Sequence, residues 1–95
     1  MIDEIGLAWA LANTADVYLT VVERHDLYIA IGIGETFVAI SLLITVIARE
    51  RVTLPRDLVC ALTAWLDGYA GNPDEPRLRA LVTHAGRHVA EAPPP

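Results

Sequence analysis

The feature that most constrains the fold is the apolar stretch from Leu27 to Ala48, which contains a single charged residue, Glu35. Its first ten residues, LYIAIGIGET, alternate isoleucine with small residues, as a half-buried strand does. Paired with the alternating residues before it, this segment could form a β-hairpin over residues 17–34. Two strands alone are seldom stable, however, and the sequence offers no third strand. We therefore favour a helix and keep an α+β fold with that hairpin as the alternative.

On a helix, the small residues of the same stretch gather on one side. They are Ala30, Gly34, Ser41, Thr45 and Ala48. A line of small side chains lets another helix approach closely, which justifies glycines that would otherwise cost about 1 kcal/mol each. The pattern predicts one long helix from about Asp26 to Arg51, buried at the centre of the protein.

Three further helices are predicted around this central one. The first lies within residues 2–22 and ends at a polar break, ERHD, over residues 23–26. The next spans residues 55–70, begins at Pro55 and stops near Gly71. The last follows a cap at Asp74 and runs to about residue 89. The prediction is thus an all-α domain of about four helices over residues 1–92, as a small antiparallel bundle or orthogonal array, with a proline tail at residues 93–95.

Composition indicates that this domain has a partner. Hydrophobic residues make up 54% of only 95 residues, which is more than a small monomer easily hides. We expect a protein partner or a homo-oligomer. The 12 acidic residues outnumber seven basic ones, all arginine, which argues against nucleic-acid binding. The absence of lysine beside many alanines suggests a GC-rich source.

No motif in the sequence supports an enzyme or predicts a cofactor. There is no nucleophile elbow and no phosphate-binding glycine loop, since GIGE has the wrong glycine spacing and no lysine follows it. The lone cysteine, Cys60, stands among apolar neighbours and is expected to be a small buried core residue. Its isolation and the lack of a basic segment at the start, MIDEIGLAW, favour a cytoplasmic location.

The alternative function is a small single-span membrane protein with residues 29–48 in the bilayer. That segment has the length of a span, but Glu35 near its centre offsets much of the apolar gain. Arginines follow the segment more than they precede it. In an inner membrane, the C-terminal part would therefore be cytoplasmic.

Six residues are the candidates for an interface. Trp9, Trp65 and Tyr69 are aromatic anchors of the kind that dominate binding energy, although core packing would also explain them. Gly34 and Ser41 mark the close helix contact. Glu35 is the single residue that most deserves a test as a functional group. It is either a buried acid or an ordinary glutamate at a helix edge.

Two histidines are weak candidates for a metal site. His84 and His88 are four residues apart, which places both imidazoles on one face of the last helix. A third ligand would have to come from elsewhere, and Arg87 would repel a cation. We therefore expect no metal. The sequence as a whole favours a non-enzymatic protein-interaction module, a regulator or inhibitor that self-associates or binds a protein through apolar helix faces.

Overall fold

A computed structural model describes the backbone of residues 3–90 and the side chains of residues 3–85. Over that range it confirms the all-α prediction, with five α-helices where about four were expected. They are α1 (Glu4–Ala15), α2 (Val21–Gly32), α3 (Thr36–Arg49), α4 (Arg56–Asp67) and α5 (Glu75–Ala90), with a short 3-10 helix, η1 (Asp16–Tyr18), after α1. The alternative hairpin over residues 17–34 is wrong, because α2 occupies most of it.

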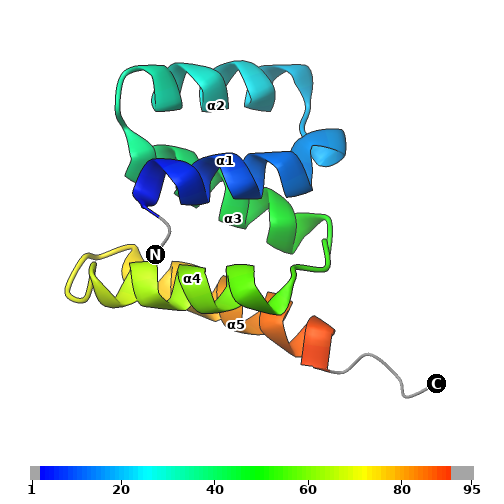
Figure 1. Cartoon of the computed structure of the whole chain (residues 1–95), viewed down its shortest axis with the longest axis vertical. Coiled ribbons are helices and arrows are strands. Elements are labelled where there is room, and N and C mark those ends of the chain that lie inside the picture. The colour runs from blue at the N-terminus through cyan, green and yellow to red at the C-terminus, as the bar shows by residue number, and fades with distance from the viewer. Residues whose placement is uncertain (1–2, 91–95) are drawn as a thin grey trace.

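The five helices form a compact bundle in which the chain runs back and forth (Figure 1). Helix α3 is central and packs against α1, α2 and α5, while α4 packs on α5 and α1. Helix α2 lies at one edge of the stack and makes its only extensive contact with α3. The middle of the chain thus holds the core together, as predicted, but through α3 alone.

The core is filled by aliphatic side chains from all five helices. Among the largest that are fully buried are Leu11, Leu27, Ile40, Leu43, Leu62, Leu66 and Leu78. Their spacing on α3 and α4 follows the three-to-four-residue period of a helix that buries one face. Helix α2 contributes least to this core, since its buried side chains are Leu27 and Ala30.

The start of α2 is set by a capping box that the predicted boundaries missed. The Thr20 hydroxyl accepts the Glu23 N–H at 3.1 Å, and the Glu23 carboxylate accepts the Thr20 N–H at 2.9 Å. These reciprocal bonds satisfy two amides that a helix start leaves unpaired. The predicted polar break at residues 23–26 is therefore wrong. ERHD lies inside α2, whose cap is Thr20.

The predicted single helix from Asp26 to Arg51 is also wrong, because the chain turns at Gly34. Gly34 has φ of +82°, and its N–H bonds the Ile31 carbonyl while the next N–H bonds Ala30. This pattern is a Schellman motif, which closes a helix with a residue in the left-handed conformation. Gly34 thus ends a helix and does not mark a close helix contact.

Helix α3 ends in the same way, but with an arginine in the glycine position. Arg51 has φ of +53°, and the Val52 N–H bonds the Ile47 carbonyl at 2.9 Å. Val52 is buried, and such a hydrophobic contact often accompanies the motif. A left-handed conformation costs a residue with a Cβ about 1–2 kcal/mol, so Arg51 is strained.

Substitutions at these two turns should change stability in opposite directions. Gly34→Ala is expected to lower the free energy of unfolding by about 1 kcal/mol. A Cβ at position 34 would meet nothing within 4 Å, so the cost comes from the backbone alone. Arg51→Gly should raise the same free energy by about 0.5–1 kcal/mol, because relief of strain exceeds the added entropy of the unfolded chain. Urea denaturation measures both, and effects of equal sign would contradict this account.

Candidate functional site

The first candidate is the Glu4 carboxylate at the start of α1, which accepts hydrogen bonds from the side chains of three different residues. Its Oε2 accepts the Trp65 indole N–H at 2.6 Å and the Tyr69 hydroxyl at 2.7 Å, and its Oε1 accepts the Thr36 hydroxyl. The donors come from α3, from α4 and from the turn after α4. One carboxylate therefore ties together three parts of the bundle that are far apart in sequence.

Aromatic rings pack around this carboxylate. The Phe37 ring lies 5.4 Å from that of Trp65 and 4.8 Å from that of Tyr69, and the Trp65 and Tyr69 centroids are 4.9 Å apart. All three pairs are tilted, as aromatic pairs prefer. Trp65 and Tyr69 were predicted as interface anchors. The structure places them together and half-buried, with their polar atoms directed at Glu4.

The state of Glu4 suits a structural role and not proton transfer. Partial burial raises the pKa of its carboxyl, but the hydrogen bonds from Thr36, Tyr69 and Trp65 together lower that pKa by more than burial raises it. The net pKa lies below the ordinary 4.5. A group that stays ionised near neutral pH, with its oxygens occupied by donors, is a poor general acid.

A hollow of about 480 Å³ adjoins Glu4 between α1 and α4. Its lining is mostly apolar and includes Leu7, Cys60, Ala61 and Trp65. Cys60 is exposed there, so the prediction of a buried core cysteine is wrong. The residue falls on the outer side of α4, away from the buried line of Leu58, Leu62 and Leu66.

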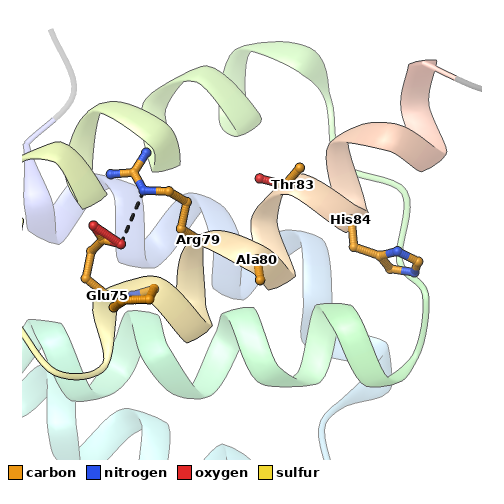
Figure 2. A pocket seen from close by; sticks show the side chains of 6 residues that line it. Glu75, Arg79, Ala80, Thr83 and His84 are labelled. Atoms are coloured by element: carbon orange, nitrogen blue, oxygen red, sulfur yellow. Dashed lines mark hydrogen bonds and ion pairs between the residues drawn. The ribbon is translucent and has the colours of Figure 1, made fainter.

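A second hollow, of about 580 Å³, lies on α5 (Figure 2). Every residue that lines it belongs to this one helix, and a single helix cannot enclose a ligand. Its charges are also engaged. Arg79 donates to Glu75 at 3.2 Å and to Asp67 at 2.9 Å. The hollow is therefore a solvated helix surface and not a binding site.

The feature that stands out is exposed apolar surface in the first two-fifths of the chain. Ten large hydrophobic side chains are exposed, from Ile5 to Val38, and between residues 39 and 85 there is none. Five of them form the outer face of α2: Val21, Val22, Tyr28, Ile29 and Ile33. Val22 is 67% exposed and Ile33 is 71% exposed. Val21, Val22, Tyr28 and Ile29 lie on the side of α2 away from its buried residues, and Ile33 follows as the C-cap, one turn after Ala30.

Helix α1 continues this surface. The Trp9 and Tyr28 rings lie 6.0 Å apart, and Ile5 is one helical turn before Trp9. We call this surface the α1–α2 apolar face and define it as Ile5, Trp9 and the five residues of the outer face of α2. Trp9 was a predicted interface residue, and the structure places it at the junction of the two helices.

The other predicted interface residues lie elsewhere. Gly34 and Glu35 are exposed in the turn that follows the apolar face, so Glu35 is not a buried acid. Ser41 is half-buried on α3, and its hydroxyl has no hydrogen-bond partner among the described residues. Sequence reasoning missed Ile29 and Ile33 as surface residues because they were assigned to the buried helix from Asp26 to Arg51. Val22 was missed because it was assigned to the end of the first predicted helix.

The two weak metal candidates are not brought into a cluster by the described part of the chain. Residues 3–85 contain no group of three or more His, Cys, Asp or Glu side chains that could hold an ion. His84 lies on α5, and the side chain of His88 falls outside the described side chains. The expectation of no metal site stays a prediction.

No helix within residues 3–90 has the length and apolar character needed to cross a membrane. The predicted span over residues 29–48 is wrong as a single helix, because the Gly34 turn divides it between α2 and α3.

Comparisons with protein-family models, with curated proteins and with solved structures gave no match to this chain.

Proposed function

We propose that the protein is a non-enzymatic protein-interaction module that docks through the α1–α2 apolar face. The observation that carries the proposal is the outer face of α2, where five large apolar side chains stand in solvent. Large apolar side chains exposed together on one helix are typical of an interaction site.

The two sides of α2 support this proposal. Leu27 and Ala30 are buried against the core, while Val22 and Ile29 on the opposite side are exposed. Large apolar side chains that a helix leaves together in solvent mark a surface that a partner covers. Helix α3 covers only one side of α2. The other side therefore leaves large apolar side chains exposed to solvent.

The energetic scale fits docking by a macromolecule. Each of the five side chains still has about half or more of its surface to bury, worth roughly 1–2 kcal/mol apiece. Their sum, on the order of 5–10 kcal/mol, falls within the range of the cost of association, about 4–15 kcal/mol. Apolar burial alone therefore gives weak binding, and polar contacts at the rim are needed for specificity.

The polar side chains described support a role without catalysis. Glu4 accepts three hydrogen bonds within the fold, and Arg49 and Arg79 are held by neighbouring carboxylates. Polar groups that are engaged in hydrogen bonds and ion pairs within the fold are not free to act on a substrate.

Photo-crosslinking in cells of the source organism tests the proposal. A photoreactive amino acid in place of Ile29 is expected to give a discrete adduct, either with a second copy or with another protein. The same amino acid in place of Thr63, exposed on α4, should give none. The adduct should form again from purified components and disappear with Val22→Ser. Absence of any adduct at position 29, or equal adducts at both positions, would end the proposal.

A further inference from the structure

The proposed function leaves open what covers the α1–α2 apolar face. The charged residues around this face indicate the kind of partner. We propose that this face receives an amphipathic helix from another protein, with apolar anchors on one side and basic residues flanking them. The inference rests on the proposed function and adds the chemistry of the partner.

The first step is the uneven distribution of charge. Residues 3–38, which contain the whole apolar face, carry six carboxylates, Asp3, Glu4, Asp16, Glu23, Asp26 and Glu35, against the single arginine Arg24. Residues 39–90 carry six arginines against five carboxylates. The apolar face therefore lies in the half of the protein that concentrates negative charge.

The second step is that two of these carboxylates are available at the face itself. Asp26 lies on α2 one turn from both Val22 and Ile29, and Glu35 follows Ile33 after the turn at Gly34. Both residues are exposed, and neither side-chain carboxylate accepts a hydrogen bond or forms an ion pair with the described residues. By contrast, Glu23 is held by Arg49 at 2.6 Å. An incoming cation next to an apolar anchor would thus find free partners.

The third step excludes a second copy of this chain as the occupant. Face-to-face pairing would bring two acidic halves together. The carboxylates of Asp26 and Glu35 in one copy would then lie near those of the other copy, and this like-charge contact is unfavourable. In head-to-tail pairing the second copy would offer its other half, whose described side chains, residues 39–85, include no exposed large hydrophobic residue. Neither arrangement satisfies both the apolar and the acidic parts of the face.

The shape of the face favours a helix. Val22, Ile29 and Ile33 form a ridge at helical spacing along α2. Tyr28, about 100° round the helix from Ile29, contacts Trp9 of α1. In Figure 1, α2 lies at one edge of the stack. An amphipathic helix that packs along α2 would contact this ridge through apolar anchors three, four and seven residues apart.

The test uses the full chain and two synthetic probes. One is a fluorescent peptide of about 14 residues made only of leucine and lysine, with leucines at helical spacing. The other is the same peptide with glutamate for every lysine. Fluorescence anisotropy at low salt is expected to give a Kd at least about tenfold lower for the basic peptide, with weaker binding as salt rises.

Two double variants separate the apolar and acidic contributions. Val22→Ser with Ile29→Ser should weaken binding of the basic peptide at least about tenfold. Asp26→Asn with Glu35→Gln should weaken it about fivefold. Asp57→Asn, at an exposed carboxylate in the first turn of α4, is the matched control and should leave the Kd within about twofold. Melting temperatures close to that of the wild type show that the variants fold.

Each contrary result has a definite meaning. Equal binding of the two peptides, or binding that ignores both double variants, would overturn the basic-helix inference, as would the absence of binding. Light scattering that shows a dimer, lost with Val22→Ser and Ile29→Ser, would replace the partner helix with a second copy. That last result would still support docking through this face, whereas failure of the crosslink at position 29 would remove the proposed function itself.

Discussion

Replacing Ile40 with alanine is expected to lower the free energy of unfolding by about 3–4 kcal/mol. Ile40 lies on the central helix α3 and is fully buried. The truncation removes buried methyl and methylene groups and leaves a cavity that helices packed from several sides cannot close. A domain of this size has roughly 5–10 kcal/mol of stability in total, so the loss should be visible as a large shift in the urea midpoint.

The matched control is the same substitution at Ile29, on the outer face of α2. Ile29 is 49% exposed, and alanine is the better helix former. We expect Ile29→Ala to change the free energy of unfolding by less than about 0.5 kcal/mol. If both substitutions cost the same, the outer face of α2 would be part of the core, and the assignment of that face to a partner would fail.

Removal of the Glu4 carboxylate is the second large effect. Glu4→Ala is expected to lower the free energy of unfolding by about 2–3 kcal/mol, because the Thr36, Trp65 and Tyr69 donors lose a charged acceptor together. Glu4→Gln keeps one oxygen in place and should cost only about 1 kcal/mol. Urea denaturation at neutral pH measures both, and Glu35→Gln, at an exposed glutamate, should cost less than about 0.5 kcal/mol.

The same carboxylate predicts how stability responds to acid. The pKa of Glu4 in the folded protein lies below 4.5, its ordinary value. Protonation therefore favours the unfolded chain, so the contribution is complete above pH 4.5 and is lost as pH falls below it. Glu4→Gln should show a smaller loss of stability than the wild type between neutral pH and the region below pH 4.5. Parallel pH profiles for the two proteins would contradict the role assigned to Glu4.

Helical class was readable from the sequence because the apolar residues of α4 and α5 repeat at three and four positions. The long central helix was misassigned for a specific reason. Gly34 was interpreted as a small packing residue, whereas its backbone conformation ends α2. Periodicity records which residues face the core, and it does not record where a left-handed turn interrupts the backbone. The T-x-x-E pattern of Thr20 and Glu23 was present and would have located the start of α2.

The contacts around the candidate site were harder to predict from the sequence than the helices. Trp65 and Tyr69 were selected for their size, but their contact with Glu4 joins residues more than sixty positions apart. No local pattern encodes such a contact, which depends on how α1 settles on α4. Exposure of Val22 and Ile29 was equally hidden, because an apolar residue reads the same in sequence whether a neighbouring helix or a missing partner covers it.

The division of α2 into an inner and an outer side has an evolutionary consequence. The residues that hold α2 to the bundle, Leu27 and Ala30, are different from those that face outward. Changes at Val22, Ile29 or Ile33 can therefore accumulate without loss of folding, and each one alters what the surface recognises. Such a scaffold can acquire new specificity by drift along one helix while its interior stays constant.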